Sequence, residues 1–408
     1  MKKFDVPNIY RSQLITAVKQ KRREEDRLKK DLSPTLLNLG AVQFYLARHF
    51  GFCYGVENAI EIAFRTIAEN PGKRIFLLSE MIHNPQVNAT LQEKGVQFLQ
   101  DTYGNQLVPF ETLTADDVVI IPAFGTTLEV EALLRQKGIA IEKYNTTCPF
   151  VEKVWNRSEQ LAAKGYSIVV HGKPKHEETR ATFSHASSHT PTVIVNDMND
   201  AVQLAQYITG QKAPEEFYRE FDGLYSKEFD IEKDLQRFGV VNQTTQLASD
   251  TQAIAEYLKQ VVMQHYGLTE ATIAERFADT RDTLCYATND NQSAVRALLE
   301  IPADLAIVVG GYNSSNTTHL VELCEAQLPT YFINGTDKLL SATEILHFNF
   351  HDKREYLTRD YLPLHRPVKI LVTSGASCPD SLVEAVLRKI AGYYDAEHLI
   401  DAYLHNLQ

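Results

Sequence analysis

Short apolar stretches alternate with helical patterns through most of the chain. Each apolar stretch is rich in β-branched residues, ends in a polar turn and is followed by apolar residues that recur with helical period. Continuous apolar stretches of this length are typical of parallel strands that are covered on both faces. The sequence therefore predicts an α/β fold. The predicted strands are residues 42–47, 74–79, 118–121, 167–171, 193–196, 239–242, 305–309 and 369–373.

Two segments interrupt this alternation, and a third precedes it. Residues 211–237 and 339–366 are rich in charged and aromatic side chains, and we interpret both as surface insertions with room for helices of their own. The N-terminal stretch is predicted to be a charged helix or arm, for which a solvated face, a clasp and an interaction segment are the alternatives. The predicted organisation is an arm at residues 1–40 followed by α/β domains at residues 41–147, 148–284 and 285–408.

Three of the five cysteines share one kind of local sequence. Cys53 in GFCYGV, Cys148 in NTTCPF and Cys285 in TLCYAT each follow an extended stretch and precede a helical pattern. Open α/β sheets bind ligands at such strand-to-helix turns, and a helix N-terminus stabilises thiolates. With one cysteine in each domain, we predict three similar α/β domains in a pseudo-threefold arrangement around one central iron–sulfur cluster. A cubane cluster normally takes four thiolates, so three cysteines leave one iron open for a substrate.

The other two cysteines need separate interpretations. Cys324 falls within the helical pattern HLVELCEAQL and is predicted to belong to the core. Cys378 in SGASCPD again stands between a strand and a helix, and both a fourth ligand and a neighbour of the site fit that position. The sequence has no CxxC motif, which removes the main signal for zinc-ribbon and thioredoxin-like sites.

The remaining strand-to-helix turns carry many neutral hydrogen-bond donors. Each Ser, Thr or Asn by itself is explained as a helix cap, but together with helix N-termini such donors can form a diphosphate pocket. His83 and His176 can donate to phosphate when protonated. Glu178 and the hydroxyl of Thr244 can form a proton chain beside a metal-bound oxygen. These turns are IHNP at 82–85, HGKPKHEE at 171–178, NQTT at 242–245, NSSN at 313–316 and SGAS at 374–377.

Composition narrows the class of protein. A chain of 408 residues that is 44% hydrophobic and 23% charged is globular and long enough for two or three domains. Its net charge of -11 disfavours binding to nucleic acid or to an anionic membrane. Its apolar stretches are far shorter than the ~20 residues that span a bilayer. An odd number of scattered cysteines suits a reducing compartment, where thiols stay reduced or bind metal.

The motifs together make the chain similar to a known family. GFCYGV, IHNP, NTTCP, HEE, NQTT, CYAT, NSSN and GASCPD occur in the order found in the hydroxymethylbutenyl diphosphate reductases, the IspH or LytB family. The resemblance runs from about residue 52 to about residue 382 and leaves out the arm and the two insertions. It implies an oxidoreductase that removes the hydroxyl group of (E)-4-hydroxy-3-methylbut-2-enyl diphosphate. The implied products are isopentenyl and dimethylallyl diphosphate, at the last step of the methylerythritol phosphate route to isoprenoids.

The resemblance also implies roles for individual residues. It makes Cys53, Cys148 and Cys285 the ligands of one [4Fe-4S] cluster per chain, through which two electrons pass, and it makes Cys378 a bystander. Glu178 would deliver protons and Thr244 would contact the substrate hydroxyl, so both are predicted to be catalytic. The predicted substrate-binding residues, most of them diphosphate contacts, are His83, His176, Thr245, Ser314, Ser315, Asn316 and Ser377.

One departure from the family pattern is visible. Many bacterial members have a His-Gly pair that contributes a phosphate-binding histidine, whereas this chain has Phe124 and Gly125. Together with the long arm and the insertions, this difference resembles the cyanobacterial and plant branch, whose expected electron donor is reduced ferredoxin. No transit peptide is recognised in the charged N-terminal stretch, which favours a cytoplasmic bacterial protein. A monomer and a homodimer both remain open.

Three other functions fit parts of the pattern. A hydratase or dehydratase would use the open iron only as a Lewis acid and would need no reductant. A redox sensor or binding module would carry the cluster as its signal and would not respond to a diphosphate. A zinc hydrolase would be colourless after anaerobic purification and would contain zinc.

Overall fold

The computed structural model describes residues 4–28, 30–278, 283 and 285–407. Its contacts divide the chain into two compact units. The first unit comprises Met1–Glu61, Ile82–Thr90 and Tyr286–Gln408, and the second comprises Ile62–Met81 and Leu91–Cys285. The division falls within two helices, α2 (Tyr54–Glu69) and α3 (Pro85–Glu93).

The first unit is built on one sheet with the strand order β1-β2-β14-β10-β11. β1 is antiparallel to β2 at one edge, and all the other neighbours are parallel. The inner strands are almost wholly apolar, and their side chains form the largest core cluster of the described residues. The strands are β1 (Thr35–Asn38), β2 (Val42–Leu46), β10 (Leu305–Val309), β11 (Thr330–Ile333) and β14 (Val368–Ser374).

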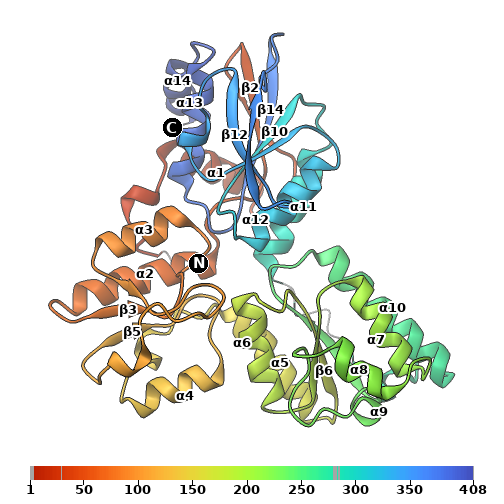
Figure 1. Cartoon of the computed structure of the whole chain (residues 1–408). Helices are drawn as coiled ribbons and strands as arrows, with labels where there is room; N and C mark the ends of the chain where they lie inside the picture. The colour runs from red at the N-terminus through yellow and green to blue at the C-terminus, as the bar shows by residue number, and fades with distance from the viewer. Residues whose placement is uncertain (1–3, 29, 279–282, 284, 408) are drawn as a thin grey trace. The chain divides into compact units, whose positions relative to one another are not determined.

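Helices from both ends of the chain cover this sheet. α1 (Gln13–Glu25) packs against α13 (Asp380–Gly392) and α14 (His398–Leu407) (Figure 1). α11 (Tyr286–Leu298) packs against α12 (Ser315–Glu325), which also contacts β10, β11 and β14. The prediction of a helix in the N-terminal arm is confirmed, and the apolar side chains of that helix are buried.

The second unit contains two smaller sheets, both parallel. One has the order β4-β3-β5 and the other the order β7-β6-β8-β9. Their strands are β3 (Ile75–Leu77), β4 (Gln97–Phe98), β5 (Val118–Ile120), β6 (Ser167–His171), β7 (Thr192–Val195), β8 (Phe238–Asn242) and β9 (Phe277–Ala278). The helices of this unit include α4 (Leu128–Gln136), α5 (Pro149–Ala162), α6 (Glu177–Ser187), α7 (Met198–Ile208) and α10 (Ala248–Tyr266).

The two insertions differ from what their composition suggested. Residues 211–237 do contain helices, α8 (Pro214–Glu220) and α9 (Ile231–Asp234), but the phenylalanines of this segment belong to the core, with Phe217 and Phe221 fully buried. Residues 339–366 contain no helix longer than a turn and instead form an antiparallel hairpin of β12 (Glu344–Asn349) and β13 (Arg354–Arg359). Both strands contain residues that favour strands, among them Ile345, Phe348 and Tyr356, although charged residues surround them.

Short 3-10 helices complete the described elements. They are η1 (Asn8–Tyr10), η2 (Phe110–Thr112), η3 (Glu142–Tyr144), η4 (Ile273–Glu275) and η6 (Thr336–Lys338). Among the described residues, no helix combines the length and the apolar character needed to cross a bilayer.

The prediction of an α/β fold is confirmed, and all eight predicted strands are present as β2, β3, β5, β6, β7, β8, β10 and β14. Three mainly parallel sheets agree with three α/β substructures. One pairing departs from the predicted boundaries. β2 was assigned to the domain at residues 41–147, yet it pairs with β14 and so belongs to the sheet of the C-terminal segment.

Candidate active site

The turn after β6 packs directly on the start of α6 and on the end of β8. A side chain at Gly172 would place its Cβ 2.6 Å from Thr179 Oγ1 and 2.9 Å from Gln243 Cβ, so only glycine fits. Thr179 Oγ1 and the Lys173 N–H both donate to Gln243 Oε1, at 3.0 and 3.2 Å. This packing brings the first turn of α6 next to the residues that follow β8.

Glu178 and His176 lie at that junction. The Glu178 carboxylate is almost fully buried and accepts a hydrogen bond from the Thr244 backbone N–H. His176 is the N-cap of α6, and its Nδ1 accepts the Glu178 N–H at 3.2 Å. Because Nδ1 accepts a hydrogen bond, the neutral imidazole has its single N–H at Nε2. This N–H can donate although the ring carries no charge. Thr245 Oγ1 accepts from Gln243 Nε2 at 2.7 Å.

The described contact between Thr244 and Glu178 uses the Thr244 backbone N–H. The proton chain, in which the Glu178 carboxylate and the Thr244 hydroxyl lie beside a metal-bound oxygen, stays a prediction. A backbone donor holds the carboxylate in place and leaves the threonine hydroxyl to contact another group. Only the fold could reveal this, since the strand-to-helix turn determines which atom faces Glu178.

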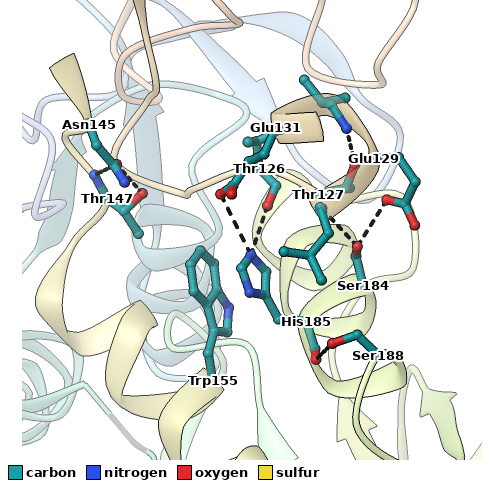
Figure 2. A network of polar contacts seen from close by, with 12 residues as sticks. Thr126, Thr127, Glu129, Glu131, Asn145, Thr147, Trp155, Ser184, His185 and Ser188 are labelled. Carbon is teal, nitrogen blue, oxygen red and sulfur yellow. Dashed lines mark hydrogen bonds and ion pairs between the residues drawn. The ribbon is translucent and has the colours of Figure 1, made fainter. Parts of the chain in front are cut away.

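Phe124 packs edge-on against the His176 ring, with centroids 5.7 Å apart. The next residue, Gly125, has a left-handed φ of +75°, and a Cβ there would lie 2.5 Å from the Trp155 ring. Trp155 stacks in turn on His185, with ring centroids 3.7 Å apart (Figure 2). An aromatic pair thus supports the turn that carries Phe124.

His185 fixes the same turn through its ring nitrogen. Its Nε2 lies 3.2 Å from the Thr126 carbonyl oxygen, which can only accept, so Nε2 carries the proton (Figure 2). Burial lowers the pKa of His185, which favours this neutral form. Ser184 donates to Glu129 and accepts from the Leu128 N–H, both at 3.0 Å. The sequence analysis did not single out His185 or Trp155, because a stack between α5 and α6 has no signature in the sequence.

The first unit repeats the close approach of a helix to strand ends. A Cβ at Gly310, after β10, would lie 2.6 Å from Thr317 Oγ1 on α12, and a Cβ at Gly375, after β14, would clash with the same hydroxyl. Gly311 similarly approaches the His83 carbonyl oxygen. The N-terminus of α12 is thereby held at the carboxyl ends of β10 and β14.

Five predicted substrate-binding residues gather at this place in the first unit, and all of them are buried. Ser377 Oγ donates to the His83 carbonyl oxygen at 3.1 Å, and Asn316 Oδ1 accepts from the Ala376 N–H at 2.9 Å. Ser314 is the N-cap of α12, with its Oγ accepting the Thr317 N–H at 3.2 Å. The five residues are His83, Ser314, Ser315, Asn316 and Ser377.

The three predicted ligand cysteines all occur at helix N-termini. Cys53 directly precedes α2, Cys148 is the N-cap of α5, and Cys285 directly precedes α11. The Cys53 N–H donates to the Ala376 carbonyl oxygen at 3.2 Å, and the Cys148 N–H donates to the Ala123 carbonyl oxygen at 2.9 Å. All five cysteines are described, and none forms a disulfide.

The other two cysteines have a different environment. Cys324 and Cys378 are completely buried in the apolar core of the first unit. Burial raises the pKa of each thiol to about 12. Such an environment is typical of cysteines that pack as small apolar residues in a core.

Cys53 belongs to the first unit, and Cys148 and Cys285 belong to the second. Within the described ranges, no group of three or more His, Cys, Asp or Glu side chains is assembled to hold a metal ion. The cysteine ligand set therefore rests on the shared local setting of the three thiols.

Comparisons with known proteins agree with this geometry. A family model described as LytB protein matches residues 44–391. The 4-hydroxy-3-methylbut-2-enyl diphosphate reductase of Cyanothece sp. is 40% identical over 353 residues, which is 86% of this chain and 84% of the relative. The protein of the same name from Gloeobacter violaceus is 39% identical over 357 residues, covering 87% and 84%.

A solved structure supports the fold. The E-1-hydroxy-2-methyl-but-2-enyl-4-diphosphate reductase from Plasmodium falciparum matches with a TM-score of 0.61 over 85% of this chain and 87% of its own, at 22% identity. Mainly parallel sheets with thiols and buried polar side chains near their strand ends define an α/β protein of the open-sheet class. Within that class, the chain belongs to the LytB family.

The contact between Gly125 and Trp155 can be tested by stability measurements. We expect Gly210→Ala to cost about 1 kcal/mol, since Gly210 also has a left-handed φ, +68°, but has nothing within 4 Å of a Cβ. Gly125→Ala should lose a further ~1–3 kcal/mol because its Cβ also meets Trp155. Chemical denaturation of both variants measures the difference. Equal losses would show that the turn does not depend on the tryptophan.

Proposed function

We propose that the chain catalyses the reductive dehydroxylation of (E)-4-hydroxy-3-methylbut-2-enyl diphosphate to isopentenyl and dimethylallyl diphosphate, at the end of the methylerythritol phosphate route. The reaction consumes two electrons and two protons and releases water. The observation that carries this proposal is the similarity over most of the chain to relatives that bear the name of this reductase. The buried carboxylate and the polar strand ends supply the chemistry that the reaction needs.

We propose one [4Fe-4S] cluster per chain, with Cys53, Cys148 and Cys285 as its ligands. The donor set fits such a cluster, because all three thiols stand at helix N-termini, where the backbone N–H groups and the helix dipole stabilise thiolates and an anionic group. When bound, the cluster supplies the two electrons and a Lewis-acidic iron with an open coordination position.

The diphosphate end of the substrate is assigned to neutral donors and a helix N-terminus. In the first unit these are His83, Ser314, Ser315, Asn316 and Ser377, which gather at the N-terminus of α12, where the helix dipole favours an anion. In the second unit the proposed donor is His176, whose Nε2–H can donate while the ring is neutral. Fixed neutral donors suit a chain with a net charge of -11, which has no basic field to attract an anion.

Proton delivery is assigned to Glu178, with Thr244 and Thr245 beside it. The Thr244 N–H holds the Glu178 carboxyl group at the end of β8 and leaves the Thr244 hydroxyl to contact the substrate hydroxyl. A proton passed from Glu178 to that hydroxyl lets the oxygen leave as water, and the allylic carbon framework receives the second proton. Burial of Glu178 keeps bulk water from competing for this position.

The electron donor is proposed to be reduced ferredoxin, because the similar relatives come from cyanobacteria. A monomer and a homodimer are both compatible with this assignment. The proposed α/β domains follow the three sheets, with β2 assigned to the C-terminal sheet.

The reaction class is tested by turnover under anaerobic conditions. The purified chain should contain about four iron and four sulfide per chain if one cubane is bound. It should convert the hydroxylated diphosphate to both products only when a reduced low-potential donor is added. Product formed without any reductant would indicate a dehydratase, and zinc in place of iron would indicate a hydrolase.

Glu178→Gln tests the proton-delivery role. We expect the rate of turnover to fall on the order of 10²–10⁴-fold, because the amide cannot transfer a proton, while substrate binding changes little. Glu177→Gln is the matched control, since it makes the same change of charge one residue earlier in the first turn of α6. Single-turnover kinetics and substrate titration separate the two effects. Full activity of Glu178→Gln would remove the assignment.

Alanine variants of the five cysteines test the ligand set. Cys53→Ala, Cys148→Ala and Cys285→Ala should each lose most of the bound iron. Cys324→Ala and Cys378→Ala should retain it, because their thiols are buried in the apolar core. Iron and sulfide analysis, with circular dichroism as a check of folding, measures the outcome. Loss of iron from a well-folded Cys378→Ala protein would make Cys378 a ligand and contradict the open iron.

A further inference from the structure

The loop that carries Cys53 is covered by the N-terminal segment at three alternate positions. Lys19 Nζ lies 4.7 Å from the centroid of the Phe50 ring, as a cation over its face. The rings of Tyr10 and Phe52 meet edge-on, with their centroids 5.9 Å apart.

The third of these contacts involves Tyr54, the residue that follows Cys53. The rings of Phe4 and Tyr54 also meet edge-on, with their centroids 4.8 Å apart. Cys53 lies between the second and third of the covered residues, so both of its neighbours in sequence are held by the N-terminal segment.

The backbone of the same loop is held from the turn after β14. The Gly51 N–H donates to Ser374 Oγ at 3.1 Å, and the Cys53 N–H donates to the Ala376 carbonyl oxygen at 3.2 Å. Gly51 has a φ of +76°, and a Cβ at this position would clash with the Asp380 carboxylate. The loop therefore has a fixed backbone on one side and side chains covered by the N-terminal segment on the other.

The N-terminal segment is itself anchored to the first unit. Leu14 and Ile15 on α1 are completely buried, and α1 packs against α13 and α14. Lys19 Nζ forms an ion pair with Asp380 Oδ1 at 2.7 Å, and Ser12 Oγ hydrogen-bonds to the Glu384 carboxylate. Of the three alternatives that the charged sequence left open, a solvated face does not fit these contacts.

We propose that residues 4–19 are a clasp that holds the Cys53 loop in the conformation that binds the cluster, so that Phe4, Tyr10 and Lys19 are positioning residues for this ligand. The proposal rests on the cluster assignment made above. Groups that orient a metal ligand without touching the metal typically change metal affinity 10–100-fold. The clasp should therefore govern how long the chain retains its cluster and leave the chemistry of the bound substrate unchanged.

The test compares variants of the clasp with a matched control. Phe4→Leu and Tyr10→Leu keep apolar bulk but remove the edge-on contacts, and their double variant removes both. Lys19→Met keeps the aliphatic stem but removes the charge over Phe50, and it remains informative if the double variant does not fold. Phe348→Leu is the control, because Phe348 stacks on Tyr312, with centroids 4.2 Å apart, in the same unit but outside the Cys53 loop.

Two readouts are needed. In the anaerobic, loaded protein, transfer of iron to a chelator should be on the order of 10–100-fold faster in the clasp variants than in the wild type, with turnover per bound cluster unchanged. In the metal-free chain, the amides of residues 50–56 should exchange hydrogen faster in the clasp variants. Phe348→Leu should match the wild type in both measurements.

The outcomes separate the two proposals. A wild-type chain that binds no iron–sulfur cluster would contradict the proposed function, and hydrogen exchange in the metal-free chain would still test the clasp. The clasp alone would be contradicted if the clasp variants retained the cluster as long as the wild type does and the amide hydrogens of residues 50–56 exchanged at equal rates.

Discussion

The close approach of helix N-termini to the ends of parallel strands is the constraint on which the site depends. In the second unit Gly172 lets Thr179 of α6 reach the end of β8. In the first unit the absence of a Cβ at Gly310 and Gly375 leaves room for Thr317 of α12. A side chain at any of these glycines would move the helix away from the strand ends, and the polar residues of its first turn would move with it.

Burial then gives the same types of side chain different roles. Cys324 and Cys378 lie in an apolar core, where burial raises the pKa of their thiols, whereas Cys53, Cys148 and Cys285 stand at helix N-termini. Burial favours the neutral form of His185, which supports a turn, while the Nδ1 of His176 accepts a backbone N–H, so that its neutral ring carries the proton on Nε2. The chemistry of the candidate site follows from these placements more than from the residue types.

The sequence was most informative where one local rule decided the structure. Short apolar stretches such as 167–171 and 305–309 became strands with the predicted bounds, because a buried parallel strand is recognisable from its own residues. The polar turns after them were found for the same reason. The resemblance to the LytB family came from these turns, and the family is confirmed.

Contacts between distant segments could not be predicted in this way. Nothing near residue 42 indicates that β2 pairs with β14, and nothing near Phe52 indicates that Tyr10 covers it. The hairpin at 339–366 was not predicted, because Glu344–Asn349 lacks the strict alternation of a half-buried strand and its strand-favouring residues stand among charged ones. The Thr244 N–H was likewise not foreseen as the partner of Glu178, because a motif specifies residues but not which atom faces the site.

We propose that three cysteines hold a cluster in which one iron remains open to the substrate hydroxyl. Mössbauer spectroscopy of the chain loaded with ⁵⁷Fe can distinguish that iron from the others. We expect one of the four irons to differ from the other three, and we expect the hydroxylated diphosphate to change the signal of that iron alone. Four irons that give the same signal with and without the diphosphate would contradict it.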